Sequence, residues 1–102
     1  MEFHRSSIEE AVGELFFVVI NEESKSIVLK PKTADVIDLF ARAQEGFTNA
    51  SQVVNAFFET ITEMSEVLHE GAPGWNIGVL DGVGGVIFMA RNGAEVFDST
   101  KR

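Results

Sequence analysis

The sequence predicts an α+β domain in which a single antiparallel sheet of about five strands has helices packed on one face. Two short runs of β-branched and aromatic residues lie near the N-terminus, and three lie near the C-terminus. Between them, residues 34–70 place apolar side chains at the helical period, so two strands precede a helical pair and three follow it. The length suits one domain, residues 1–102.

The N-terminal third predicts a short helix and a β-hairpin. Residues 6–12 begin with Ser6 and Ser7, either of which can cap a helix. The unbroken apolar run in residues 14–20 suggests burial on both faces, and hence a central place in the sheet. A polar turn at residues 21–25 connects it to a second strand, residues 26–30, which Pro31 ends.

The middle of the chain predicts two helices in succession. Thr33 is the expected N-cap of the first helix, residues 34–45. Asn49 is the expected N-cap of the second, with Gln52 in the capping-box position. The second helix should end near residue 70, before Gly71 and Pro73. Its predicted core side consists of Val53, Val54, Phe57, Ile61, Met64 and Leu68.

Three strands are predicted after the helices. Residues 75–80 alternate, with Trp75, Ile77 and Val79 on one face, and residues 86–91 follow a glycine-rich turn. Asn92 and Gly93 form a strong two-residue hairpin signal that leads into residues 94–98. Gly78 within a strand indicates a bulge or a close approach of backbone.

Composition excludes several classes of function. A net charge of −8 argues against direct contact with nucleic acid or with an anionic membrane, because phosphate contacts need Lys and Arg. The longest apolar run is far too short to span a bilayer. Cysteine is absent, so no disulfide, thiolate catalysis or Cys-ligated zinc is expected. These properties fit a cytoplasmic protein.

The most informative functional feature is a stripe of glutamates on the second predicted helix. Glu59, Glu63, Glu66 and Glu70 fall on the side opposite the apolar residues, within about 80° of arc. The like-charged pairs at i and i+4 each cost about 0.2–0.5 kcal/mol of helix stability. No Lys or Arg occurs from Ala43 to Ala90 to offset them.

Two interpretations of this acidic stripe remain open. Complementary charge would steer association with a basic surface on another protein and select the partner. Alternatively, the stripe is a solvated face that keeps a phenylalanine-rich protein soluble.

The remaining groups of polar residues and glycines predict no metal site, phosphate-binding loop or catalytic site. Glu66 and His69 have metal-ligand spacing, but they lie on the polar side of the helix, and further carboxylates are lacking. The glycines of residues 78–88 do not fit a phosphate-binding loop. Asp81 and Asp98, near strand ends, are expected to be turn residues. The sequence therefore predicts no catalytic residue, no metal and no cofactor.

The leading hypothesis is a non-enzymatic protein-binding module, an adaptor or inhibitor that docks a basic surface through the acidic stripe. An inhibitor that mimics nucleic acid is a variant of it. The alternative is a small-molecule sensor domain with a pocket between sheet and helices, lined by Trp75, Phe88 and Met89. Either is compatible with a homodimer formed through edge strands, for which residues 26–30 are short and apolar enough.

Overall fold

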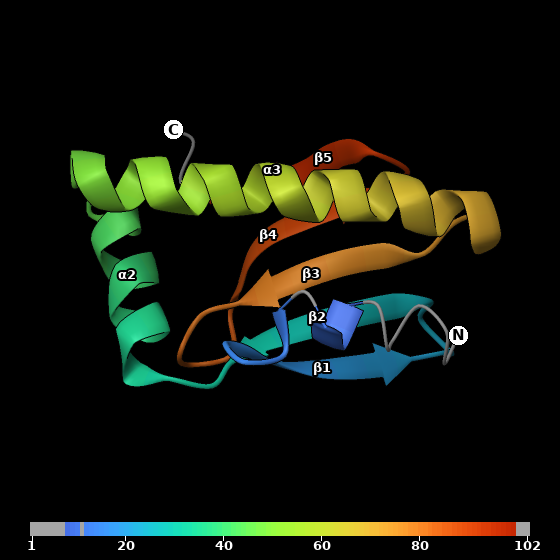
Figure 1. Ribbon diagram of the computed structural model, residues 1–102, viewed down its shortest axis with the longest axis horizontal. Helices are drawn as coiled ribbons and strands as arrows, with labels where there is room; N and C mark the ends of the chain where they lie inside the picture. The colour runs from blue at the N-terminus through green and yellow to red at the C-terminus, as the bar shows by residue number, and fades with distance from the viewer. Residues whose placement is uncertain (1–7, 11, 100–102) are drawn as a thin grey trace.

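The computed structural model describes residues 8–10 and 12–99, and it confirms the predicted fold class (Figure 1). Residues 8–10 and 12 are helical and precede the first strand, and the predicted caps Ser6 and Ser7 lie outside the described residues. The elements that follow are β1 (Phe16–Asn21), β2 (Ser26–Pro31), α2 (Ala34–Gln44), α3 (Thr48–Gly71), β3 (Asn76–Leu80), β4 (Val86–Arg91) and β5 (Ala94–Asp98).

The five strands form one sheet in the order β1-β2-β3-β4-β5. Three of the four neighbouring pairs are antiparallel, but β2 and β3 are parallel, with Ile27 beside Ile77. The sheet is therefore mixed rather than purely antiparallel. The cause is the connection, because the chain passes through α2 and α3 between these strands and returns to the end of the sheet where β2 began.

Strand β1 lies at an edge of the sheet and not in its centre, contrary to the prediction. Phe16 and Val18 are buried beneath the helices, whereas Phe17 and Val19 are 54% and 45% exposed. Its unbroken apolarity reflects one covered face and one open face. The predicted pairing of residues 26–30 across a dimer is also wrong, because β2 is bonded to β1 and β3 and has no free edge.

The start of α2 agrees with the prediction, and that of α3 does not. The Thr33 side chain caps α2 by accepting a hydrogen bond from the Val36 amide, at 3.3 Å. Helix α3 starts at Thr48, and its N-cap Phe47 makes no side-chain hydrogen bond, so Asn49 is already helical. The reason is the tight connection: Ser51 Oγ donates to the Ala43 carbonyl oxygen, which ties the first turn of α3 to α2.

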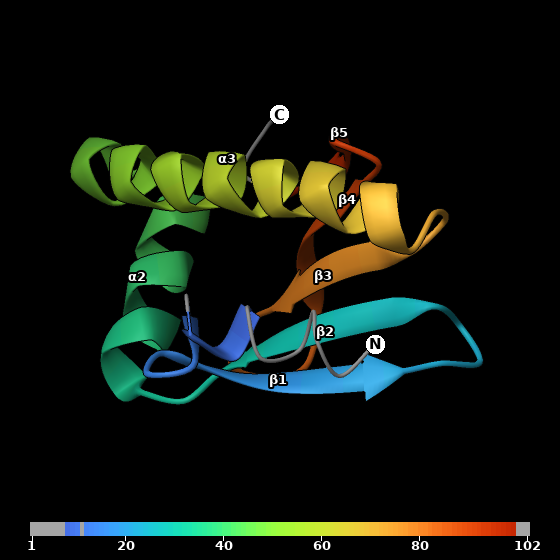
Figure 2. The ribbon, with the colours of Figure 1, turned by 45° about the vertical axis from the view of Figure 1, so that its right-hand side comes forward.

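Helix α3 crosses the sheet over β3, β4 and β5, while α2 stands at the side and packs on β2 (Figures 1 and 2). The buried face of α3 is rotated slightly about the helix axis from the predicted face. Val53 is 55% exposed, and Phe58 takes the core position.

Phenylalanine rings connect the layers of the core. Phe16 of β1 stacks on Phe57 of α3, with 5.0 Å between ring centroids. Phe58 stacks on Phe88 of β4 at 4.2 Å, and Phe40 of α2 contacts both α3 rings. These rings fix the position of α3 over the sheet, and with it the position of the glutamates.

The predicted hairpin at Asn92 and Gly93 is confirmed. Both residues have positive φ, 54° and 78°, and they join β4 directly to β5. None of the helices that the structure describes is long and apolar enough to cross a membrane.

Candidate functional site

The four glutamates of the acidic stripe are all exposed on the outer side of α3, as the helical period predicts. The opposite side of the helix is buried against the sheet, and it includes Ile61, Ser65 and Leu68. The structure thus places Glu59, Glu63, Glu66 and Glu70 in solvent.

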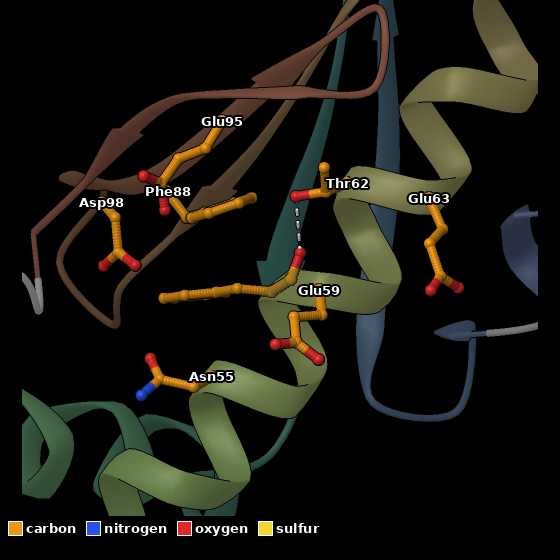
Figure 3. A pocket seen from close by; sticks show the side chains of 8 residues that line it. Asn55, Glu59, Thr62, Glu63, Phe88, Glu95 and Asp98 are labelled. Atoms are coloured by element: carbon orange, nitrogen blue, oxygen red, sulfur yellow. Dashed lines mark hydrogen bonds between the residues drawn. The ribbon is translucent and has the colours of Figure 1, made fainter.

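The stripe borders a groove between α3 and the β4–β5 hairpin (Figure 3). The groove has a volume of about 510 Å³ and is lined by Asn55, Phe58, Glu59, Thr62, Glu63, Phe88, Glu95 and Asp98. The stacked rings of Phe58 and Phe88 lie at its base. Carboxylates therefore border the groove from two directions, because Glu59 and Glu63 come from the helix and Glu95 and Asp98 come from β5.

A hydrogen bond from the β4–β5 turn holds the hairpin against α3. The buried hydroxyl of Ser65 accepts a hydrogen bond from the Gly93 amide at 2.9 Å, and donates one to the Thr62 carbonyl oxygen at 2.7 Å. Gly93 also lies against the side chain of Glu66: a Cβ added to this glycine would stand 2.9 Å from the Cβ of Glu66. Ser65 and Gly93 together set the spacing between the two walls of the groove.

Negative charge dominates this side of the molecule. Helix α3 carries no Lys or Arg, and no groove-lining residue is basic. Arg42 forms an ion pair with Asp38 on α2, at 3.0 Å, away from the groove. The groove and stripe therefore present one acidic surface, suited to guanidinium and ammonium groups.

Sequence reasoning missed Glu95 and Asp98 as members of this surface. The register places Glu95 beside Ala90 and Asp98 beside Phe88, so both share the helix-covered face of the sheet. The Asn92–Gly93 hairpin carried the signal for Glu95, because it fixes the pairing next to the turn. Asp98 reaches the same face only through a register shift between Met89 and Ala90, for which the sequence gives no signal.

The other candidate residues do not form a site. Glu66 and His69 are both exposed on α3, and residues 8–10 and 12–99 contain no group of three or more His, Cys, Asp or Glu placed to hold a metal. Asp81 accepts hydrogen bonds from the amides of Val83 and Gly85 within the β3–β4 loop. That is the turn role the sequence predicts.

The predicted pocket of Trp75, Phe88 and Met89 is not present as such. Phe88 pairs with Val79 on the helix-covered face of the sheet, whereas Met89 pairs with Gly78 on the other face. Neighbouring residues of one strand point to opposite sides, so these two side chains cannot line one pocket. Phe88 instead belongs to the acidic groove.

No protein-family model matches the sequence, and neither the curated proteins nor the solved structures include a significant match.

Proposed function

We propose that the protein is a non-enzymatic protein-binding module, an adaptor or inhibitor that docks a basic surface of a partner through the acidic face of α3. One observation carries the proposal. The exposed glutamates of α3 continue across the groove to Glu95 and Asp98, so the acidic surface spans two elements that are far apart in the sequence.

Such a surface fits an Arg or Lys side chain better than a flat helix face does. A cation in the groove lies within reach of carboxylates on both walls, and its aliphatic stem can follow the groove toward its aromatic base. The long-range field of the surface accelerates association, and the groove adds selectivity.

The test is a pull-down of tagged protein from native cell extract at low and high salt, with identification of retained proteins by mass spectrometry. Three double variants, each removing two charges, are compared with the parent. Glu59→Gln with Glu63→Gln changes the groove, and Glu66→Gln with Glu70→Gln changes the rest of the stripe. Glu22→Gln with Glu23→Gln changes exposed acids in the β1–β2 turn and is the matched control.

We expect one basic protein to be retained at low salt by the parent and the control, and to be lost from the groove variant. The association rate should fall with rising ionic strength, and less steeply for the groove variant. Equal retention by all four proteins would refute docking through this surface. A nucleic-acid-binding partner would identify the protein as an inhibitor that mimics nucleic acid. The absence of cysteine from the sequence is compatible with the cytoplasmic setting proposed for this binding.

The second candidate function is a sensor domain for a small molecule. The groove favours it, because its volume lies within the ~300–1,000 Å³ of small-molecule sites. Its carboxylates would select a cationic ligand such as a polyamine. Thermal-shift titration with spermidine tests this: a shift that disappears in the Glu59→Gln, Glu63→Gln variant would support it, and no shift would exclude polyamines.

A further inference from the structure

The face of the sheet turned away from the helices carries a row of apolar residues across all five strands. The register aligns Val19 of β1, Val28 of β2, Gly78 of β3, Met89 of β4 and Phe97 of β5 side by side. Val19 and Phe97, at the two edges, are 45% and 46% exposed, and Val28 and Met89 are half-buried. No helix of the described chain covers this row.

Polar and charged residues border the row along the strands. On one side the register aligns Asn21, Ser26, Asn76, Arg91 and Ala94, and Arg91 donates to the Asn76 side-chain oxygen at 2.7 Å. On the other side Phe17 is paired with Lys30, and Leu80 with Val86, so this border is largely apolar; the Lys32 ammonium lies 5.1 Å from the centre of the Phe17 ring. The open face thus has an apolar surface with a polar rim along one side, as protein interfaces often have.

Gly78, at the middle of the row, is buried in the single chain beside Met89. A Cβ there would meet the Met89 Cε and the Phe88 carbonyl oxygen at 3.9 Å, an ordinary contact, and its φ is not positive. A glycine inside a strand is less stable than alanine, because it loses more conformational freedom on folding. A glycine on the central strand places no side chain above the sheet, which suits the close approach of another backbone.

We propose that this open face binds the same face of a second copy, so that the protein is a homodimer with two sheets packed face to face. The two-fold axis runs along the apolar row and brings Gly78 next to Gly78 of the second copy. Phe17 of β1 and Val86 of β4, 54% and 44% exposed, lie on strands of the same sheet, whereas Phe47, Val67 and Val83 lie outside the strands. The row is thus part of an extended apolar surface, which a two-fold axis matches to the same surface of another copy.

The size of the face suits a dimer. Five strands spaced ~4.8 Å apart, each of about six residues rising ~3.3 Å, give a footprint of ~480 Å² per copy. Two copies then bury ~950 Å² of projected area, near the ~1,000 Å² that separates specific interfaces from incidental contacts. The side chains are not flat, so the accessible area removed is larger than this projection.

The charges around the face favour the same arrangement. None of the strand positions that the register places on this face is acidic, although the chain has a net charge of −8. A two-fold axis along the row reverses the strands of the second copy. Glu22 and Glu23 in the β1–β2 turn then face the end where Lys30 of the second copy lies. Lys32 at the same end donates to the Gly13 carbonyl oxygen of its own chain at 2.7 Å, and both lysines border a groove with Glu9, Glu10 and Glu14. These rim charges set the orientation more than the affinity.

The experiment is sedimentation velocity over a concentration series, with thermal unfolding to confirm that each variant folds. The parent should sediment as a species of twice 11.2 kDa. Val19→Lys and Phe97→Lys, at opposite ends of the row, should each raise the dimer dissociation constant about a hundredfold or more, because they bury an unpaired charge. Val67→Lys, on an exposed site of α3, is the control and should leave the dimer intact.

Gly78→Ala keeps the test independent of misfolding. It should leave unfolding of the monomer unchanged or slightly improved and still weaken the dimer. A charge swap tests the relative orientation of the two copies. Lys30→Glu should weaken the dimer about twofold to fivefold, and adding Glu22→Lys should restore the dimer affinity.

The proposal is overturned if the parent is monomeric at every concentration, including the case in which it then binds lipid vesicles or a different protein. It is also overturned if Val67→Lys dissociates the dimer while Val19→Lys and Phe97→Lys do not. Failure of the dimer proposal would not count against the proposed function of the acidic groove. The groove lies on the helix-covered side of the sheet, and its variants are tested separately.

Discussion

Replacing Ser65 by alanine should loosen the hairpin that forms one wall of the acidic groove. Ser65 is fully buried on α3, and its hydroxyl accepts the hydrogen bond of the Gly93 amide at 2.9 Å. Alanine fits the same space without that acceptor. The β4–β5 turn then loses its hydrogen bond to the helix.

The magnitude follows from the two groups involved. Leaving a buried or half-buried amide without a partner costs about 1–3 kcal/mol. Alanine is the better helix former and returns about 0.5 kcal/mol. The net loss in the free energy of unfolding should be about 1–2 kcal/mol, which for a chain of this length lowers the melting temperature by about 5–15 °C.

The assay is urea unfolding followed by circular dichroism and by the fluorescence of Trp75, with amide hydrogen exchange at Gly93. Thr60→Ala is the matched control, because its exposed hydroxyl donates only to the Ala56 carbonyl of the same helix. The control should be neutral or more stable by about 0.5 kcal/mol, because alanine is also a better helix former than threonine. If Ser65→Ala and Thr60→Ala agree within about 0.5 kcal/mol, or if Gly93 exchange is unchanged, the Ser65 hydrogen bond does not hold the hairpin.

Three further substitutions test neighbouring features. Gly93→Ala should cost about 1–3 kcal/mol of stability, because φ is +78° and the new Cβ would meet Glu66 at 2.9 Å. Thr33→Ala should cost about 1 kcal/mol by removing the cap of α2, measured as loss of unfolding free energy in urea. Phe88→Ala should cost about 3–5 kcal/mol by the same measurement, since it empties the core beside Phe58.

Each of these has a result that contradicts it. Gly46→Ala shares the positive φ but has open space around the added Cβ, so an equal loss at Gly93 would rule out the contact with Glu66. A neutral Thr33→Ala would mean that water caps α2 as well as the side chain does. A loss below about 1 kcal/mol for Phe88→Ala would mean that the core closes over the gap.

Most of the secondary structure could be predicted because its signals are local. Pro31, the Thr33 cap and the Asn92–Gly93 turn each act within a few residues, and the structure agrees with them. The position of β1 could not be predicted in this way. A continuous apolar strand results either from burial on both faces or from one open apolar face, and sequence alone does not distinguish them.

The site was predictable in part for the same reason. The helical period fixed the glutamates of α3 on one exposed side, but the phase of the helix was slightly wrong, because Phe57 and Phe58 are adjacent and equally apolar. Contact with the sheet decides between them. Glu95 and Asp98 joined the site only through the packing of the hairpin on α3, which depends on residues distant in sequence.

The parallel pairing of β2 with β3 has a consequence for how the chain is made. It joins two units, the β1–β2 hairpin and the β3–β4–β5 meander, each of which forms from nearby residues. Joining them requires closing a loop that contains both long helices, a non-local step that is slow compared with hairpin formation. During synthesis the N-terminal hairpin emerges first, and the edge of β2 stays unpaired until β3 has left the ribosome. In this interval the backbone groups of β2 that will pair with β3 form a free strand edge, so the nascent chain is prone to edge-to-edge aggregation before its last third is translated.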